Sequence, residues 1–399
     1  MSLNNTPAAN RIHIGIFGKR NAGKSSLINA LTGQSLAIVS DVKGTTTDPV
    51  YKTMELLPLG PVMLIDTPGI DDAGELGEQR VQKSYQVLNK TDIALLVTDG
   101  PELSPEDEAL ITRIKDKEIP YVIAYNKCEN YPDFVPAGTN EIAVSALENI
   151  HIHELKELLA AQQTEDANRR KLVSDLVSPG DFVILVVPID KAAPKGRLIL
   201  PQQQTIRDLL DAGAVSVVVK DTELEQTLAS LGKPPRLVIT DSQIFGKVAK
   251  IVPATVPLTS FSILMARYKG ILTTAVSGVT ALHTLKDGDR ILIGEGCTHH
   301  RQCEDIGTVK LPRWIREFTG KEPEFIFTSG TEFPEDLSGY HMAVHCGGCM
   351  LNEREMKYRL RCAREQDVPM TNYGTLIAYM NGILKRSVAV LPEITNILE

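Results

Sequence analysis

The sequence predicts an α/β protein built from three successive α/β domains, the first with a mostly parallel sheet. Short Val- and Ile-rich runs alternate with longer amphipathic stretches, as expected for parallel strands covered by helices. A Gly-rich segment follows the first apolar run directly, and Cys and His residues follow two strands of the last block. These observations predict a nucleotide-binding domain, a small middle βα domain and a C-terminal α/β domain with a metal site.

Length, charge and cysteine usage restrict the class of protein. The chain has 399 residues, enough for two or three domains with separate cores, and its net charge is −8. This charge gives no general attraction to nucleic acid or anionic membranes, so we expect neither as a partner. We find no 18-residue apolar run and no export signal, and the six cysteines are too few for a disulfide scaffold. We therefore expect a cytoplasmic protein whose CxxC serves metal binding or redox chemistry.

Four segments are expected along the chain. Residues 1–10 are expected to form a flexible tail, residues 11–168 the nucleotide-binding domain, residues 175–265 the middle domain and residues 270–399 the C-terminal domain. The middle segment has the strands FVILVVPI, VSVVVK and RLVITD, but it has no phosphate loop and no catalytic set. We expect this chemically bare segment to serve dimerisation.

A long amphipathic helix is predicted over residues 352–366. Three apolar residues recur at i, i+4 and i+7 and predict its buried stripe: Met356, Leu360 and Ala363. Glu355 and Arg359 are spaced i,i+4, and we expect this pair to lie on the solvent side of the helix.

The Gly-rich segment from Gly18 to Ser25 reads GKRNAGKS and matches the phosphate-binding pattern GxxxxGK[ST]. Its backbone N–H groups are expected to surround phosphates at a helix N-terminus. Lys24 is expected to reach the β- and γ-phosphates, and Ser25 to offer its hydroxyl to Mg²⁺.

Three further motifs follow in the order found in small GTPases: DTPG at 66–69, NKCE at 126–129 and SAL at 145–147. Together with the phosphate loop they resemble the TrmE/Era-like bacterial GTPases. The resemblance implies that Asp66 holds Mg²⁺ through water and that the N–H of Gly69 contacts the γ-phosphate. It also implies a guanine site around Asn126 and the SAL segment.

The switch segment GTTTD at 44–48 resembles the TTRD pattern of the same GTPases. Thr46 is the better candidate for the second Mg²⁺ hydroxyl, and Thr45 is its rival. Among the expected site residues, Lys24, Thr46, Asp66 and Gly69 are assigned to catalysis. The full set expected to bind GTP or GDP and its cations comprises Gly18, Asn21, Ala22, Gly23, Lys24, Ser25, Ser26, Thr45, Thr46, Asp66, Gly69, Asn126, Lys127, Glu129, Ser145 and Ala146.

Three positions depart from the Ras-like pattern or extend it. Glu129 stands where the guanine-reading motif has Asp, so the fit to guanine is expected to be looser. Ile70 stands where Ras-like enzymes place a water-orienting Gln, which predicts slow intrinsic hydrolysis. Asn21 occupies the position that K⁺-dependent relatives use, so K⁺ beside the phosphates is expected to stimulate hydrolysis.

The Cys and His residues of the last block follow strands that we expect to be parallel. Cys297 follows RILIGEG, and His345 and Cys346 close YHMAV and open the motif HCGGC, which ends at Cys349. If the strands are parallel, these groups emerge at the same carboxyl edge of the sheet, where α/β folds place ligands. His299 completes a CxH…HCxxC set.

The spacing of this set is compatible with more than one centre. Zinc would accept three thiolates and one imidazole. A 4Fe–4S cluster would take three thiolates and leave one iron for another ligand. Free buried cysteines are the alternative without a metal. Several further residues are expected to be incidental to the site: Cys128, Cys303, Cys362, His13, His151 and His153.

The GTPase motifs, the bare middle segment and the CxH…HCxxC set together resemble the FeFe-hydrogenase maturation GTPase family, over essentially the whole chain. The resemblance implies a 4Fe–4S cluster on Cys297, Cys346 and Cys349, with the fourth position open to His299, His345 or an exchangeable ligand. It implies a scaffold and carrier that takes a di-iron precursor from radical-SAM maturases and delivers it to apo FeFe-hydrogenase, and a homodimer formed by the middle segment.

Two alternatives share part of this evidence. The first is a tRNA-modification or ribosome-assembly GTPase with a structural zinc site, which the acidic charge and sparse aromatic residues disfavour. The second is a GTP-dependent metallochaperone for another metal centre, which shares every residue role and differs only in cargo and client.

Overall fold

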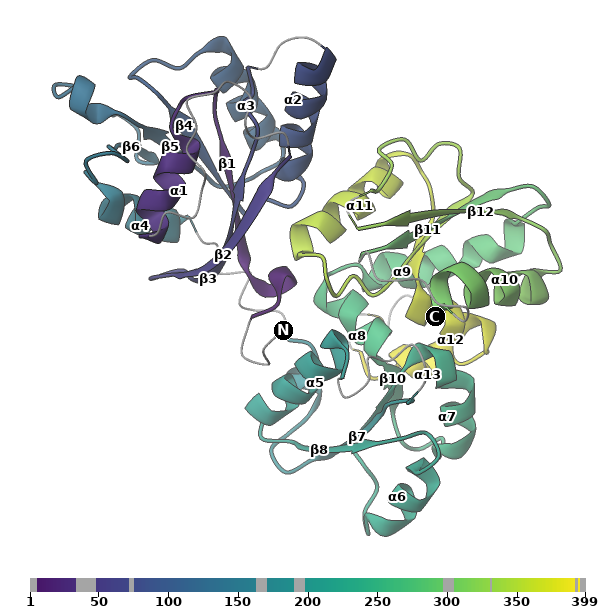
Figure 1. The fold of residues 1–399 in the computed structure, drawn as a ribbon. Helices are drawn as coiled ribbons and strands as arrows, with labels where there is room; N and C mark the ends of the chain where they lie inside the picture. The colour runs from purple at the N-terminus through teal and green to yellow at the C-terminus, as the bar shows by residue number, and fades with distance from the viewer. Residues whose placement is uncertain are drawn as a thin grey trace. The chain divides into compact units, whose positions relative to one another are not determined.

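The computed structural model describes residues 6–33, 48–71, 75–162, 171–189, 198–296, 305–330, 332–391 and 394. They form two compact units, Met1–Arg169 and Arg170–Glu399, and each is described by itself (Figure 1). Both units are α/β, which confirms the predicted fold class. Among the described residues, we find no helix with the length and apolar character needed to span a membrane.

The first unit has one six-stranded sheet in the order β2-β3-β1-β4-β5-β6. All neighbouring strands pair in parallel except β2 and β3, which pair antiparallel. Its strands are β1 (Ile12–Phe17), β2 (Val50–Leu56), β3 (Gly60–Asp66), β4 (Ile93–Thr98), β5 (Tyr121–Tyr125) and β6 (Glu141–Ala143). Its helices are α1 (Lys24–Thr32), α2 (Glu75–Leu88), α3 (Pro105–Asp116) and α4 (Ile152–Ala161). The predicted parallel sheet is therefore confirmed, with one antiparallel edge strand that the sequence reading missed.

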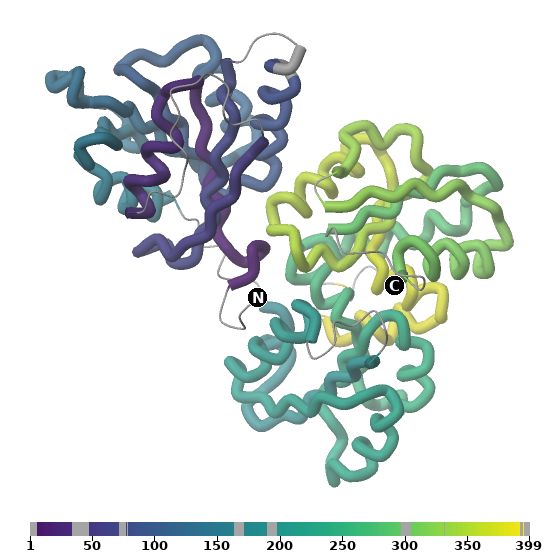
Figure 2. The backbone as a smooth tube through the Cα atoms, viewed as in Figure 1, coloured from purple at the N-terminus to yellow at the C-terminus, as the bar shows by residue number. Residues whose placement is uncertain are grey.

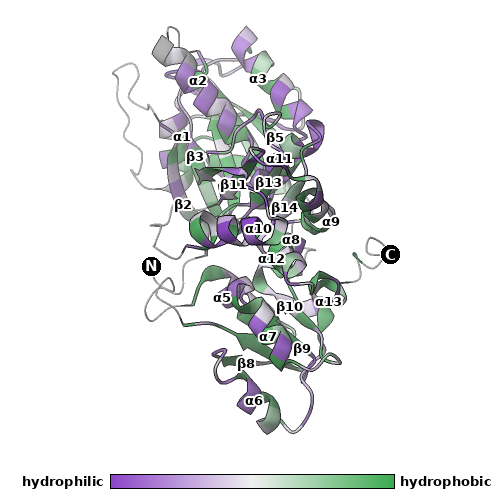
Figure 3. Ribbon diagram, turned by 90° about the vertical axis from the view of Figure 1, so that its right-hand side faces the viewer, coloured by the Kyte–Doolittle hydropathy of each residue, from purple (hydrophilic) through white to green (hydrophobic). Residues whose placement is uncertain are grey.

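Burial explains why β2 was missed and the central strands were found. Strands β1, β3 and β4 are apolar and largely buried, and the ribbon around the labels β3 and β5 is mainly green in Figure 3. Strand β2 alternates exposed and half-buried residues, so it lacks the continuous apolar run of a central strand. Ser104 caps the start of helix α3: its side chain accepts from the N–H of Asp107, the Asp107 carboxylate accepts from the N–H of Ser104, and Pro105 is the first residue of the helix.

The second unit has two parallel four-stranded sheets, in the orders β10-β9-β7-β8 and β12-β11-β13-β14. The strands of the first sheet are β7 (Phe182–Val186), β8 (Val215–Val219), β9 (Leu237–Thr240) and β10 (Leu258–Ser260). Those of the second are β11 (Arg290–Glu295), β12 (Glu324–Ser329), β13 (Met342–His345) and β14 (Met370–Asn372). The helices are α5 (Leu200–Asp211), α6 (Leu224–Ser230), α7 (Phe245–Ile251), α8 (Phe261–Tyr268), α9 (Leu272–Gly278), α10 (Leu311–Thr319), α11 (Glu353–Glu365), α12 (Tyr373–Met380) and α13 (Leu384–Val388).

The two sheets of the second unit share one hydrophobic core. A single cluster of contacting buried side chains extends from Leu172 to Ile394 and includes residues of both sheets. Helices α12 and α13, in the yellow part of the tube in Figure 2, return to the first of these sheets, where α13 contacts β10 and α12 contacts α7 and α8. The middle and C-terminal domains predicted from the sequence thus each have a sheet, and helices of both close the core between them.

Helix α11 confirms one prediction and corrects another. Met356 and Ala363 are buried, as predicted. Glu355 and Arg359 are not on a solvent face: their exposed fractions are 5% and 0%. The prediction was wrong because α11 packs on both sides, with Met356 in the shared core and Ala363 in a second cluster that includes Leu292 of β11.

Candidate nucleotide and metal sites

The phosphate loop lies between β1 and the start of α1. Lys24 is buried, and its Nζ donates to the carbonyl oxygens of Gly18 at 2.8 Å and Lys19 at 2.7 Å. Gly23 has a φ of +90°, and a Cβ at this position would lie 2.2 Å from Nδ2 of Asn126. The loop therefore needs glycine here, both for its backbone conformation and for its approach to the Asn126 side chain.

Asp66 ends β3 beside the first turn of α1. The Ser25 hydroxyl donates to its Oδ2 at 2.8 Å, whereas its Oδ1 is buried and has no hydrogen-bond partner among the described residues. Burial raises the pKa of the Asp66 carboxyl, against the opposing effects of Ser25 and Lys24. A buried carboxylate oxygen without a partner, next to a serine hydroxyl, is a donor set that fits Mg²⁺ and its waters.

The guanine motifs meet at Asn126. Its Nδ2 donates to the Ala22 carbonyl at 2.9 Å, and its Oδ1 accepts from the Ala146 N–H at 3.1 Å. This side chain thus joins the phosphate loop to the SAL segment. Ser145 is fully buried and accepts from the N–H of Glu148, and Oε2 of Glu129 is buried without a hydrogen-bond partner among the described residues.

Three other residues predicted to bind the nucleotide lie in the phosphate loop or in the guanine motif NKCE. Ala22 is buried, Asn21 is exposed with a φ of 60°, and Lys127 has a φ of 64°. Thr45 and Thr46 lie outside the described residues, so their assignment stays a prediction. Gly69 lies against Arg20, a neighbour that the sequence does not predict. A Cβ at position 69 would lie only 2.5 Å from the Arg20 side chain, so this position has no room for a larger residue.

The predicted metal site begins where β11 and β13 run in parallel. Gly294 pairs with His345 in the register of the two strands, and the Cys346 N–H donates to the Gly294 carbonyl at 2.9 Å. The two strands are therefore parallel, and the described residues at their carboxyl ends, Gly296 and Cys346, lie at the same edge of one sheet. After β11 the described residues extend to Gly296, and after β13 they extend through Cys349 and beyond.

The Cys346 sulfur lies among backbone N–H groups. Its Sγ accepts from the N–H of Gly296 at 3.1 Å and from that of Gly348 at 3.4 Å. Burial raises the pKa of the Cys346 thiol, and these two N–H groups act in the opposite direction. N–H donors aimed at sulfur favour the thiolate, which is the form that binds metals.

Cys349 lies near Cys346 and near the buried ammonium group of Lys269. Burial, followed by the neighbouring Cys346, raises the pKa of Cys349 to about 12, and Lys269 opposes this shift. Lys269 is 2% exposed, and its Nζ donates to the Leu351 carbonyl at 2.7 Å. Lys269 is the C-cap of α8, a helix of the middle segment. Its ammonium group therefore reaches from that segment to the loop of residues 346–351, here called the cysteine loop.

The cysteine loop passes between helices on both sides. A Cβ on Gly347 would contact Ser262 and Met265 of α8 at 3.6–3.9 Å. Gly348 has a φ of +63°, and a Cβ there would lie 2.7 Å from the sulfur of Met356 on α11. The loop can approach α11 so closely only because position 348 carries no side chain.

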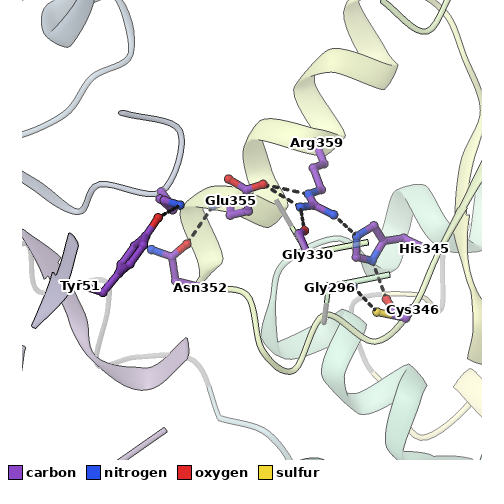
Figure 4. Close-up of polar contacts among 9 residues, drawn as sticks. Tyr51, Gly296, Gly330, His345, Cys346, Asn352, Glu355 and Arg359 are labelled. Atoms are coloured by element: carbon purple, nitrogen blue, oxygen red, sulfur yellow. Dashed lines mark hydrogen bonds and ion pairs between the residues drawn. The ribbon is translucent and has the colours of Figure 1, made fainter. Parts of the chain in front are cut away.

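His345 has both ring nitrogens in hydrogen bonds (Figure 4). Nη1 of Arg359 contacts Nε2 at 2.9 Å, and Nδ1 lies 2.8 Å from the Cys346 carbonyl oxygen. Because a guanidinium can only donate, Nε2 accepts and Nδ1 carries the hydrogen. Burial and the Arg359 charge lower the pKa of His345 to about 3, so the ring is neutral.

Arg359 is itself held by several groups. Its Nε and Nη2 donate to Oε1 of Glu355 at 3.0 and 2.8 Å, and Nη2 donates to the Gly330 carbonyl at 2.6 Å. Its guanidinium carbon lies 5.0 Å from the ring centroid of Phe333. Figure 4 shows Arg359 between Glu355 and His345. The sequence reading missed this cluster because an i,i+4 Glu–Arg pair is also the pattern of an exposed helix face.

Cys297 and His299 lie outside the described residues, so their predicted part in the metal site stays a prediction. Among the residues that are described, no group of three or more metal-binding side chains is assembled. His13 and Cys362 are buried as expected, and Cys128 lies within the guanine motif NKCE. His151 and His153 are exposed, and Cys303 lies outside the described part of the chain.

Three family models match successive parts of the chain. Residues 13–127 match the 50S ribosome-binding GTPase family. Residues 172–270 match the hydrogen maturase F dimerization domain, and residues 273–390 match the hydrogen maturase F tetramerization domain. The first unit is thus a GTPase domain, and the matched parts of the second unit are both hydrogen maturase F domains.

Curated relatives match the GTPase part. The tRNA modification GTPase MnmE of Xanthomonas oryzae pv. oryzae is 36% identical over 163 residues, covering 39% of this chain and 36% of that protein. MnmE of Desulforamulus reducens is 30% identical over 211 residues, covering 52% and 45%. The chain spans less than half the length of these relatives.

Among solved structures, Aquifex aeolicus Era bound to GDP and AlF₄⁻ is 21% identical, with a TM-score of 0.33, covering 52% of this chain and 92% of that one. The family matches are more specific than these likenesses, because both domain types that follow the GTPase domain have been defined in hydrogen maturase F. With this order of domains, the chain belongs to the hydrogen maturase F family, the GTPases of hydrogenase maturation.

Proposed function

We propose that the protein is a GTP-hydrolysing scaffold and carrier in the assembly of the FeFe-hydrogenase active site. It binds a 4Fe–4S cluster and a di-iron precursor and delivers the precursor to apo FeFe-hydrogenase. The observation that carries the proposal is the partly buried pair Cys346 and Cys349, with N–H donors at one sulfur and Lys269 near the other, in a chain with hydrogen maturase F domains.

The residues present fit such a cluster. Two partly buried thiols lie in a glycine-containing turn, and Gly296, the residue before Cys297, donates to one of them. Cys297, Cys346 and Cys349 are the proposed ligands. When bound by three thiolates, a 4Fe–4S cluster has one iron that is free of cysteine. The buried Lys269 and the N–H groups are suited to stabilise the negative charge of a thiolate-bound cluster.

The GTPase domain is proposed to time the exchange of partners. Switch segments of GTPases are ordered by the γ-phosphate and Mg²⁺ and are released after hydrolysis. This change of order would distinguish a form that receives the precursor from radical-SAM maturases from a form that releases it to the hydrogenase. If nucleotide leaves the affinity for apo-hydrogenase unchanged, this role is excluded.

The function is tested by anaerobic reconstitution of the full chain with iron and sulfide, followed by absorption and EPR of the reduced protein. We expect a brown protein and an EPR signal that are both lost in Cys346→Ala. Transfer of iron from the loaded wild-type protein to apo-hydrogenase then tests delivery. A colourless protein with one zinc per chain would contradict the proposal and support a GTPase with a structural zinc site.

Potassium is proposed to stimulate hydrolysis through Asn21. We expect GTP hydrolysis to be about tenfold faster in K⁺ than in Na⁺. This is less than the ~100-fold that a full catalytic hydrogen-bond donor contributes. Asn21→Ala is expected to abolish the difference, while the rate in Na⁺ stays the same. Phosphate release measured at equal ionic strength in the two salts checks this. Stimulation that persists in the variant would exclude Asn21 as the K⁺ ligand.

A homodimer is proposed to form along β8, an edge strand of its sheet. This strand reads VSVVV, and Val215 and Val218 are 41% and 45% exposed. An apolar edge strand is a template for pairing with a second copy. Val218→Asp is expected to halve the molar mass measured by light scattering, because it places a charge in the interface. Gln226→Asp on the exposed face of α6 is the control and should leave the mass unchanged.

A further inference from the structure

We propose that His345 does not bind iron but positions Cys346, and that Arg359 holds His345 in this role. The inference rests on the proposed cluster and concerns how this chain prepares one of its thiol ligands. It gives the buried Glu355–Arg359 pair a role, and it removes His345 from the candidates for the fourth ligand of the cluster.

The side chains of His345 and Cys346 point in different directions. Val344 and Cys346 pack against the shared core, together with Met265 of α8. The His345 ring instead lies near Phe333, at 6.4 Å between ring centroids, on the side where Arg359 is found. Successive residues of a strand point to opposite faces, so the imidazole and the thiol of this His-Cys pair lie on different faces of the sheet.

The imidazole of His345 has no free nitrogen. Nε2 accepts from Arg359, and Nδ1–H donates to the Cys346 carbonyl. An iron ligand needs the lone pair that Nε2 uses here or that Nδ1 would expose only after losing its hydrogen. Turning the ring toward the thiols would leave a buried Arg359 N–H without its partner, at a cost of about 1–3 kcal/mol.

Arg359 cannot follow such a movement of the His345 ring. Glu355 binds it through two N–H groups, the Gly330 carbonyl through a third contact, and the Phe333 ring lies against it. The side chain is fully buried, so water cannot replace a lost contact. Its direction is therefore fixed by groups independent of His345.

The consequence for Cys346 follows from its carbonyl group. The Nδ1–H of His345 orients this carbonyl, and with it the peptide that links Cys346 to Gly347. That peptide begins the turn in which the Gly348 N–H reaches the Cys346 sulfur at 3.4 Å. Glu355, Arg359 and His345 thus form a chain of contacts that holds the first turn of HCGGC in the conformation that aims the thiol.

The test compares His345→Asn, His345→Ala and His299→Asn with wild type after reconstitution of the full chain. Pulsed EPR of the reduced cluster detects nitrogen bonded directly to iron, and loss of absorbance to a chelator measures how firmly the cluster is held. The amide introduced by His345→Asn can replace the Nδ1–H donor but is a poor iron ligand. Fluorescence of Trp314, the chain's single tryptophan, verifies that the second unit is folded in every variant.

We expect the nitrogen coupling of wild type to be unchanged in His345→Asn, whether or not His299→Asn alters it. His345→Ala is expected to lose the cluster at least about tenfold faster than wild type, and His345→Asn to restore most of the retention. A directly bonded nitrogen that disappears in His345→Asn would overturn the inference, and so would wild-type retention in His345→Ala. A wild-type chain that takes up no cluster would instead refute the proposed function.

Discussion

Asp66→Asn is expected to raise the Mg²⁺ concentration needed for half-maximal GTP hydrolysis by about 10- to 100-fold. Asp66 has one carboxylate oxygen bound to the Ser25 hydroxyl and a second that is buried without a hydrogen-bond partner among the described residues. That second oxygen is where a water of the Mg²⁺ shell would be held. An amide has nearly the same shape but lacks the charge that attracts the metal. Phosphate release over a Mg²⁺ titration measures the shift.

Without Mg²⁺, Asp66→Asn should no longer weaken nucleotide binding. Without Mg²⁺ the Asp66 carboxylate repels the phosphates, so GDP should bind Asp66→Asn at least as tightly as wild type in EDTA. Asp116→Asn, at the exposed end of α3, serves as the control and should behave as wild type in both conditions. Equal weakening with and without Mg²⁺ would show that Asp66 supports the fold of the loop rather than the metal.

Arg359→Met is expected to lower the free energy of unfolding of the second unit by about 3–5 kcal/mol. The substitution leaves the Glu355 carboxylate, only 5% exposed, without the guanidinium that it binds. The double variant Glu355→Leu/Arg359→Met removes both charges and is expected to recover most of the loss. Urea unfolding followed by the fluorescence of Trp314 measures these energies, because the single tryptophan lies in the second unit.

The pair Glu353 and Lys357 supplies a matched control on the same helix. Their charged groups are 2.7 Å apart, but the side chains are 33% and 52% exposed. Lys357→Met should therefore change the free energy of unfolding by less than about 1 kcal/mol. If Arg359→Met also costs less than about 1 kcal/mol, the Glu355–Arg359 pair is solvated in solution, and its role in holding His345 is lost with it.

Much of the fold could be predicted because its signals are local. Central strands such as β4 are buried on both faces and read as unbroken apolar runs, and GKRNAGKS needs its glycines whatever surrounds it. The parallel pairing of β11 and β13 is the condition from which the sequence places the end of the strand before Cys297 at the same edge as His345 and Cys346, and the structure has this pairing. These features follow from periodicity and backbone geometry over a few neighbouring residues.

The parts that were missed depend on distant contacts. Strand β14 has three residues and is a strand only because it pairs with β13. Arg359 has the sequence context of a surface residue, and its burial depends on Gly330 and His345, which are remote in the chain. Lys269 likewise reaches the Leu351 carbonyl across a sequence separation of 82 residues. No pattern within one helix could reveal these partners.

The position of Lys269 has a consequence for how the two matched segments can evolve. Residues 172–270 and 273–390 match two separate family models, and the border between them falls just after this lysine. Its ammonium group nevertheless supports the loop of Cys349 in the other segment, and the two segments share one core. A gene fusion that moved only the cysteine-bearing segment to another GTPase would leave the lysine behind and expose the apolar side chains that pack against α8. The two segments are therefore expected to be gained and lost together in evolution, as a single module.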